Sequence, residues 1–325
     1  MMSSAYDVLG IGNAIVDVIS RADDGFLGQH GLVKGSMMLI DEDRAEQLYA
    51  AMGPGIEVSG GSCGNTMAGI ASFGGTGAYI GKVRDDQLGK VFQHDITAVG
   101  VSFQTPKAQS GPSTARCLIL VTPDAQRTMN TYLGACTGLG PDDIDPKLVG
   151  SAQVTYVEGY LWDAPAAKQA VLKAFDAAHA HDRLVSITLS DSFCVHRYRD
   201  EFRDLVRNKV DILFGNESEI TALYEVETFE EAMEATRRDA KIAVLTRSEK
   251  GSVVLKGSET WAVPAAPVAK VVDTTGAGDL FAAGFLHGFT RGQPLAECAR
   301  LGGIAAAEII SHVGARPEQP LRGLV

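Results

Sequence analysis

The sequence has no excess of positive charge and no long apolar run. Its 325 residues include 29 lysines and arginines against 40 aspartates and glutamates, for a formal charge of −11. A chain of this kind is poorly suited to nucleic acid or an anionic membrane surface, although backbone dipoles can still hold a small phosphate ligand. No run reaches the roughly 20 apolar residues that a membrane-spanning helix needs. We therefore expect no nucleic-acid partner and no membrane partner.

Cysteine and histidine are also scarce. The five cysteines are scattered without a C-x-x-C pair, and the seven histidines show no metal-ligand spacing. This excludes the common zinc and redox motifs and fits a reducing compartment. Residues 1–7 lack a basic region followed by an apolar core, so we expect no signal peptide. Together these features predict a cytoplasmic protein.

Glycine, in contrast, is frequent, with 36 residues. From residue 154 onward, apolar β-rich runs alternate with helical stretches. The expected strands are 154–158, 184–189, 210–214 and 242–246, and the helices between them include 165–181, 201–208 and 229–238. This alternation predicts an α/β fold with a mostly parallel sheet and helices on both of its faces. Ligand sites in such folds gather at the carboxyl ends of the strands.

One glycine loop, residues 273–279, leads directly into an apolar helix expected over 280–286. At a helix start, unpaired N–H groups and the helix dipole form a site for negative charge. Gly276 and Gly278 let the backbone bend and approach a ligand closely. Asp279 can then accept a proton from an attacking hydroxyl group while the N–H groups hold a phosphoryl group. The alternative is an ordinary helix start in which this carboxylate only stabilises the dipole; the neighbouring oxygen-bearing side chains weigh against it.

A second acidic candidate, Asp17, interrupts the apolar strand expected over 15–19. By strand alternation it either faces solvent or binds a polar ligand. The preceding Gly10-x-Gly12 pair is not a dinucleotide-binding fingerprint, because Ile15 replaces the third glycine and no helix pattern follows. A dehydrogenase is therefore disfavoured.

Two more stretches precede expected helices. Residues 59–65 contain the pair Gly60 and Gly61, which marks either a plain loop with a cap or a backbone that flexes or contacts a ligand. Asn216 to Glu219 follows the strand expected over 210–214, and it is either a plain helix cap or part of a ligand site.

These stretches, within residues 10–17, 59–89, 216–219 and 273–288, occur in the order found in the ribokinase-like (PfkB) family of carbohydrate and nucleoside kinases. The sequence resembles the adenosine kinase branch of that family. The resemblance implies a three-layer α/β/α fold with a mostly parallel central sheet and a small β-sheet lid. It also implies a single kinase domain over residues 1–325, with the lid formed from segments of about 14–41 and 105–135.

The resemblance further implies roles for individual residues. The catalytic set would be Asp279 as general base, the loop residues Gly276, Ala277 and Gly278, and Arg127 at the donor phosphates. The residues expected at the acceptor are Asn13, Asp17, Gly60, Gly61 and Asn65, with Asp17 on two sugar hydroxyls. The residues expected at the nucleotide are Asn216, Thr246, Gly251, Gly276 and Gly278. Glu219 would hold Mg²⁺ through water, and Asp273 and Thr275 would hold a monovalent cation such as K⁺.

We therefore expect an ATP- and Mg²⁺-dependent kinase of purine salvage that phosphorylates the 5′-hydroxyl of a nucleoside, adenosine to AMP. Ile15, Met38 and Met129 are predicted to sandwich the purine, and the aromatic stretch 159–163 either adds surface for a base or packs in the core. A sugar kinase for ribose or fructose is the alternative enzyme, and a catalytically silent nucleoside sensor is the alternative outside catalysis. The sequence leaves monomer and homodimer open.

Overall fold

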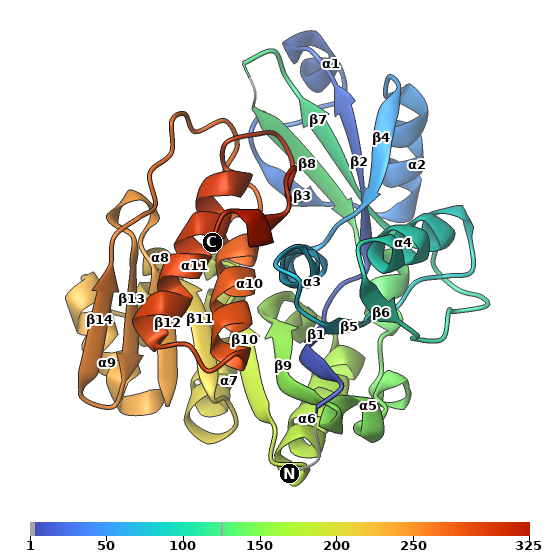
Figure 1. Cartoon of the computed structure of the whole chain (residues 1–325). Helices are drawn as coiled ribbons and strands as arrows, with labels where there is room; N and C mark the ends of the chain where they lie inside the picture. Colours follow the sequence, from blue (N-terminus) through green and yellow to red (C-terminus); the bar gives the residue numbers. More distant parts are fainter. Residues whose placement is uncertain (1–3, 125) are drawn as a thin grey trace.

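The computed structural model describes residues 4–124 and 126–325. Residues 1–3, on which the expectation of no signal peptide partly rests, and residue 125 lie outside the described residues. The chain forms one nine-stranded sheet and one five-stranded sheet (Figure 1). Among the described residues, no helix combines the length and apolar character needed to cross a membrane.

The large sheet has the strand order β14-β13-β12-β11-β10-β9-β1-β5-β6. Its strands are β1 (Tyr6–Ile11), β5 (Gly77–Ile80), β6 (Val101–Phe103), β9 (Ala152–Glu158), β10 (Leu184–Thr188), β11 (Ile212–Asn216), β12 (Ile242–Thr246), β13 (Ser252–Lys256) and β14 (Glu259–Val263). Neighbouring strands run parallel from β12 to β6, and only the pairs β12–β13 and β13–β14 are antiparallel. The predicted mostly parallel sheet is therefore confirmed.

Helices cover both faces of this sheet because its strands are apolar on both sides. In β1, Leu9 and Ile11 pack on one face and Val8 packs on the other. The first face is covered by α5 (Pro146–Gly150), α6 (Pro165–Ala180), α7 (Ser192–Asn208), α8 (Glu217–Tyr224) and α9 (Phe229–Asp239). The second is covered by α3 (Ser62–Ser72), α4 (Gln87–Ala98), α10 (Ala277–Thr290) and α11 (Leu295–Ile309). The three-layer α/β/α architecture follows.

The helix expected over 201–208 is the second half of α7. The helix begins nine residues earlier, where the Asp191 carboxylate accepts a hydrogen bond from the Cys194 amide and caps it. Tyr198 inside α7 has non-helical backbone angles (φ −127°, ψ 26°), so the helix is kinked there and one apolar period does not run through its whole length.

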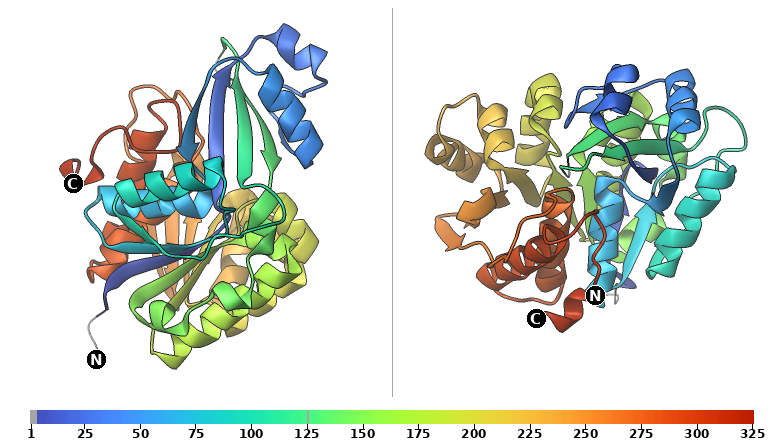
Figure 2. Two further views of the ribbon diagram at one scale, coloured as in Figure 1. Left: turned by 90° about the vertical axis from the view of Figure 1, so that its right-hand side faces the viewer. Right: turned by 90° about the horizontal axis from the view of Figure 1, so that it is seen from above.

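The smaller sheet stands over the carboxyl-end edge of the large one, as the left view of Figure 2 shows. Its order is β3-β8-β7-β2-β4, with β2 (Ile15–Arg21), β3 (Met37–Leu39), β4 (Gly55–Ser59), β7 (Ala115–Val121) and β8 (Arg127–Tyr132). The short helix α1 (Asp24–Gln29) and α2 (Glu42–Ala51) lie beside it (Figure 1). The expected small second sheet is present, and it also includes β4, which lies outside the two segments predicted to form the lid.

The chain crosses between the two sheets twice at one place. Residues 12–14 lead from β1 up to β2, and Gly60 and Gly61 lead from β4 back down to α3. Next to this crossing, the strand order reverses between β1 and β9: later strands extend from β1 through β5 to one edge and from β9 through β10 to the other. Such a reversal leaves a crevice at the carboxyl ends of the strands, where α/β proteins bind ligands.

Candidate active site

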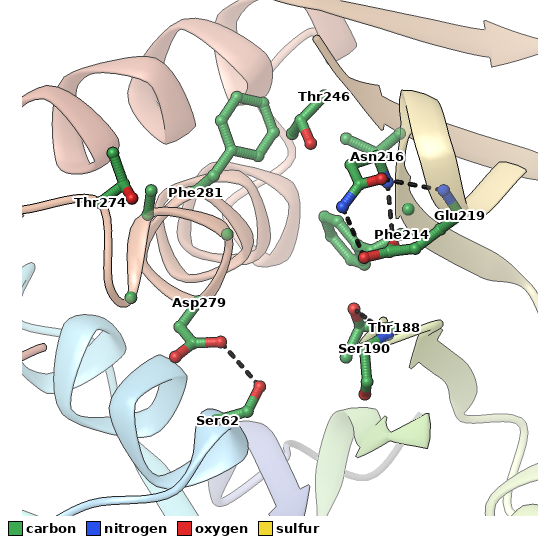
Figure 3. Close-up of a pocket in the computed structure, with 15 residues that line it drawn as sticks. Ser62, Thr188, Ser190, Phe214, Asn216, Glu219, Thr246, Thr274, Asp279 and Phe281 are labelled. Carbon is green, nitrogen blue, oxygen red and sulfur yellow. Dashed lines mark hydrogen bonds between the residues drawn. The ribbon is translucent and has the colours of Figure 1, made fainter. Parts of the chain in front are cut away.

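A cavity opens above the carboxyl ends of β10, β11 and β12, facing the start of α10 (Figure 3). Its polar lining comes from the sheet on one side and from the helix starts on the other. The lining residues are Ser62, Thr188, Ser190, Phe214, Gly215, Asn216, Glu219, Val244, Thr246, Thr274, Gly276, Ala277, Gly278, Asp279 and Phe281. The cavity thus joins three of the four sequence stretches at one surface: 59–89 through Ser62, 216–219 through Asn216 and Glu219, and 273–288 through the glycine loop.

The loop before α10 takes the form that its glycines predict. Gly276 has a φ of +80°, in the left-handed region, and a Cβ there would lie 2.9 Å from the Ala315 Cβ. As the N-cap residue, Gly276 has no side chain with which to cap the helix, so first-turn N–H groups remain available for an external anion. Gly278 is exposed, and a Cβ there would meet nothing within 4 Å. The open space at Gly278 is therefore where a ligand can approach this helix start.

Asp279 lies in the first turn of α10 and is held by two side chains of α3. The Ser62 hydroxyl donates to Asp279 Oδ1 at 2.7 Å, and the Asn65 amide Nδ2 donates to Asp279 Oδ2 at 2.9 Å. Figure 3 shows Ser62 and Asp279 pointing toward one another on the same side of the cavity. Burial raises the pKa of Asp279, while the hydrogen bonds from Ser62 and Asn65 and the charge of Arg316 oppose that rise. The carboxylate is thus fixed in orientation beside the anion site.

Asn65 was expected to contact a sugar, and the structure places its Nδ2 on Asp279 instead. Its other amide atom, Oδ1, is buried and has no hydrogen-bond partner among the described residues. An unpaired buried acceptor is costly, so a ligand donor at this oxygen would relieve that cost. Asn65 can therefore orient Asp279 and still accept a hydrogen bond from an acceptor substrate.

Asp17 points from β2 toward the same crevice. A Cβ at Gly60 would overlap the Asp17 carboxylate, so only glycine permits this approach. Gly61 has a φ of +81°, and a Cβ there would overlap the Asn13 carbonyl oxygen. Burial raises the Asp17 pKa to about 6, against the lowering charges of Arg316 and Arg127, and the charge of Asp279 raises it further. Both glycines are thus required by close packing around Asp17 and Asn13.

Glu158, at the end of β9, is a buried carboxylate that the sequence reasoning missed. Its Oε1 accepts hydrogen bonds from the Asn13 backbone N–H at 2.9 Å and from the Asn13 Nδ2 at 2.7 Å, and its Oε2 accepts one from the Cys63 N–H at 2.8 Å. Asn13 lies in the first chain crossing between the sheets, and Cys63 lies in the first turn of α3, directly after the second crossing. Glu158 therefore ties both crossings to the large sheet. The sequence signal that could have identified Glu158 is a glutamate at the end of an otherwise apolar strand.

At the other end of the cavity, Asn216 and Glu219 bond to each other. The Asn216 side chain accepts from the Glu219 N–H, and the Glu219 carboxylate accepts from the Asn216 N–H at 3.0 Å and from its Nδ2 at 2.6 Å. This is a capping box at the start of α8 (Figure 3). Burial raises the Glu219 pKa to about 7 against the Asn216 backbone hydrogen bond. The two alternatives predicted for this motif are therefore compatible, since the residues that cap α8 also line the cavity.

Thr246 also lines the cavity, but Gly251 does not. Gly251 has a φ of +85°, and a Cβ there would overlap the Val263 carbonyl oxygen, so the glycine is needed by the β13–β14 hairpin. Ser248 in the same loop has a φ of +53°. A left-handed residue favours glycine, and the serine here occupies it at some cost in strain.

Arg127, predicted at the donor phosphates, forms an ion pair in the structure. Its Nε lies 3.0 Å from Asp273 Oδ2, and both side chains are buried. Asp273 also accepts from the Thr275 N–H and the Gly314 N–H, each at 3.0 Å. The Arg127 Nη2 is buried without a partner among the described residues. The smaller sheet is thereby fastened to the loop that precedes the anion site.

The inner face of the smaller sheet is set by its register. Met37 pairs with Met129, Met38 pairs with Asn130, and Asp17 pairs with Cys117. Since paired residues share a face, Met37 and Met129 lie on the face of Asp17, and Met38 points to the other face. The register therefore places Met37, and not Met38, on the same face as Ile15 and Met129, and the contact of this face with a purine stays a prediction.

The aromatic stretch after β9 lies partly in the core and partly at the edge of the site. Trp162 is buried in the core, where its Nε1 donates to Glu201 at 2.9 Å, so it offers no surface to a ligand. Tyr160 is partly buried, and its hydroxyl donates to the Ser190 carbonyl oxygen at 3.3 Å. The packing alternative is correct for Trp162.

A fixed carboxylate beside uncapped helix N–H groups is the arrangement that phosphoryl transfer to an alcohol requires. Residues 39–322 match the model of the pfkB family of carbohydrate kinases, so the chain belongs to this family of phosphotransferases with an alcohol acceptor, which use ATP. The expected family is confirmed.

Individual relatives extend the likeness over the whole chain. The structure of adenosine kinase from Sinorhizobium meliloti is 57% identical, covers 98% of each chain and superposes with a TM-score of 0.92. A probable sugar kinase protein from Rhizobium etli CFN 42 is 53% identical over 99% of this chain and 98% of its own, with a TM-score of 0.93. Adenosine kinase 2 of Arabidopsis thaliana is 26% identical over 98% of both chains.

Proposed function

We propose that this protein is an ATP-dependent nucleoside kinase that transfers a phosphoryl group to the 5′-hydroxyl of adenosine, forming AMP. The observation that carries the proposal is the position of Asp279, held by Ser62 and Asn65 at the uncapped start of α10. The similar adenosine kinases from Sinorhizobium meliloti and Arabidopsis thaliana support the choice of acceptor.

In this proposal Asp279 is the general base. The attacking hydroxyl oxygen forms the new bond to phosphorus, its proton passes to Asp279, and the nucleoside diphosphate leaves. General-base assistance of this kind is worth roughly 10²- to 10⁴-fold in rate. The first-turn N–H groups of α10 hold the transferring group and stabilise the charge that develops on it.

The acceptor is proposed to lie between Asp17 and Asp279. The Asp17 carboxylate makes no hydrogen bond within the described residues, so both of its oxygens can accept from a diol such as the ribose hydroxyls. The unpaired Asn65 Oδ1 adds one more acceptor beside Asp279. A ribose with neighbouring hydroxyl groups matches acceptors arranged in this way.

The purine is proposed to rest on the apolar inner face of the smaller sheet. Ile15, Met37 and Met129 share this face with Asp17, so a base attached to the ribose would meet them directly. Phe193, at the start of α7 above the carboxyl end of β10, is 73% exposed and adds an aromatic ring at this edge of the large sheet. Apolar and aromatic surface suits a purine better than a free sugar.

The donor is proposed to lie along the cavity from Thr246 to Gly278. The described residues hold no group of three or more histidine, cysteine, aspartate or glutamate side chains that could ligate a metal directly. Glu219 nevertheless keeps lone pairs beyond those used by Asn216, which suits a bond to metal-bound water. Mg²⁺ bound in this way neutralises charge on the donor phosphates.

A monovalent cation fits the structure less well. Asp273 already carries one cationic partner, Arg127, and its oxygens accept two backbone hydrogen bonds. A cation at this carboxylate would have to compete with a buried guanidinium group. The site at Asp273 and Thr275 stays a prediction, and none of the steps above depends on it.

The test is a substrate screen with the purified protein, ATP and Mg²⁺, in which adenosine, other nucleosides, ribose and fructose are supplied singly. We expect phosphorylation of adenosine at the 5′ position, and Asp279→Asn should retain adenosine binding in calorimetry while losing roughly 10²- to 10⁴-fold in kcat. The exposed Asp142→Asn should behave as wild type. Near-normal turnover by Asp279→Asn would remove this residue from the mechanism.

A sugar kinase is the second candidate, supported by the similarity to the probable sugar kinase protein from Rhizobium etli CFN 42. Preferential phosphorylation of ribose or fructose in the same screen would establish it. Adenosine binding without consumption of ATP by the wild-type protein would instead identify a nucleoside sensor.

A further inference from the structure

Arg316 lies in the segment after α11, and its guanidinium group contacts the chain on both sides of the crossing at Gly60 and Gly61. Its Nε donates to the Ser59 carbonyl oxygen at 3.0 Å, and its Nη2 donates to the same oxygen at 2.7 Å and to the Ser59 hydroxyl at 3.1 Å. Its Nη1 donates to the Gly64 carbonyl oxygen at 2.6 Å. Ser59 ends β4, and Gly64 is in the first turn of α3. One guanidinium group therefore bridges the two sides of the glycine turn.

This bridge matters because the residues that contact Asp279 and Asp17 lie in the glycine turn or directly after it. Ser62 and Asn65, which hold the two oxygens of Asp279, begin directly after the turn, and Gly60 packs against Asp17. A change in the turn would therefore move the partners of both carboxylates together. The planar fork of arginine fixes two carbonyl groups at once, which a lysine with its single nitrogen head does not reproduce.

Arg316 also carries a positive charge that none of the ion pairs among the described residues neutralises. Among the described residues its hydrogen bonds go to Ser59 and Gly64, and it has no carboxylate within ion-pair distance. The titratable groups that face it are Asp17, Asp279, Tyr79 and Asp95. The other groups that face the two carboxylates are Arg127, Cys63, Cys117, Tyr156, Glu158 and Tyr160. A cation without a close anionic partner favours the ionised form of both nearby aspartates.

We propose that Arg316 is a positioning residue for phosphoryl transfer: its fork fixes the Ser59–Gly64 turn that orients Asp279, and its positive charge faces both Asp17 and Asp279. The proposal rests on the proposed kinase function for its link to turnover. Its structural half, the fixing of the turn, stands independently. Burial lowers the pKa of Arg316 only to about 10, so the group is charged at neutral pH.

Two substitutions separate the fork from the charge. Arg316→Lys keeps the charge but removes the fork, and Arg316→Gln removes both, so the difference between the two variants isolates the effect of the charge. We expect Arg316→Gln to lower kcat/KM for adenosine by roughly 10- to 100-fold and to move the acidic limb of the pH–rate profile upward by roughly half a unit to one unit. Arg316→Lys should lose turnover while the acidic limb stays near its wild-type position. The KM for ATP should stay within about twofold in both, since Arg316 makes no hydrogen bond to the residues proposed to bind the donor.

A second readout does not depend on catalysis. Amide hydrogen exchange over residues 59–66 should become roughly tenfold faster in both variants, because bonds from a charged donor to two carbonyl groups are lost. The matched control is Arg322→Gln, an exposed arginine of the same C-terminal segment, which should change neither readout.

The outcomes are distinguishable. An Arg316→Gln protein with wild-type exchange over 59–66 and an unshifted acidic limb would overturn the proposal. If the wild-type protein phosphorylates no acceptor, the proposed function fails, and the exchange experiment alone decides whether Arg316 fixes the turn. If Arg316→Gln does not fold, as judged by circular dichroism, Arg316→Lys decides in its place.

Discussion

We call the part of the cavity lined by Asn216, Glu219 and Thr246 the donor end. There the hydrogen-bonded partners Asn216 and Glu219 are three residues apart, in one helix turn. At the acceptor end (Asp17, Ser62, Asn65 and Asp279), the partners of Asp279 are 217 and 214 residues away from it along the chain. The donor end is therefore built by local helix geometry. The acceptor end exists only when three distant segments meet, so it should respond more strongly to changes in the surrounding fold.

The largest expected effect tests the tightest contact of the acceptor end. In Gly60→Ala, the new methyl group would overlap the Asp17 carboxylate. Displacing a binding group by about 1 Å costs on the order of 10²-fold, so we expect such a loss in kcat/KM for the nucleoside with an unchanged KM for ATP. Steady-state kinetics with each substrate varied in turn measures both. Gly138→Ala, where a Cβ meets nothing within 4 Å, is the matched control. Equal losses for both substrates would contradict a localised effect.

Glu158→Gln tests the tie between the two chain crossings. The amide would direct N–H groups at Asn13 or Cys63, both of which donate, so unfolding should become easier by roughly 1–3 kcal/mol. Urea unfolding measures this, with the exposed Glu249→Gln as control.

The same variant also has a pH signature. Burial raises the Glu158 pKa from 4.5 to about 7 in the folded protein. Between these values the unfolded chain releases its proton first, so the wild-type free energy of unfolding decreases as pH rises through this window and levels off above it. Glu158→Gln should show a shallower decrease. An unchanged slope would mean that Glu158 is ionised throughout this range.

A smaller effect sharpens the placement of the purine. Met129→Ala should raise the KM for adenosine roughly tenfold, equivalent to about 1.4 kcal/mol, because Met129 shares the face of Asp17. Met38→Ala removes the same side chain from the opposite face and should leave this KM unchanged. The reverse result would place the base on the outer face of the smaller sheet.

The smallest effect belongs to the donor end. Asn216→Ala removes a helix cap and should lower the free energy of unfolding by about 1 kcal/mol while raising the KM for ATP a few-fold. Thr228→Ala removes the equivalent cap of α9, which also has a capping box but does not line the cavity. It should reproduce the loss of stability without the change in KM. A rise in the KM for adenosine in Asn216→Ala would show that the donor end and the acceptor end are energetically coupled.

The sequence by itself determined what depends on near neighbours in the chain. The alternation of apolar runs predicts the parallel sheet, Asn216–Glu219 predicts a helix start, and the spacing of Gly276, Gly278 and Asp279 predicts an anion site. Each of these features uses periods or contacts of a few residues, so it can be recognised in a linear string.

Only the tertiary structure decided which distant groups meet. It brought Glu158 to Asn13 and Cys63, set Arg127 on Asp273, and placed Arg316 on Ser59 and Gly64. It also settled by strand register that Met37, and not Met38, shares a face with Asp17. Hydrogen bonds and ion pairs act only over a few ångströms, and no pattern along the chain specifies which residues 95 or more positions apart will come that close.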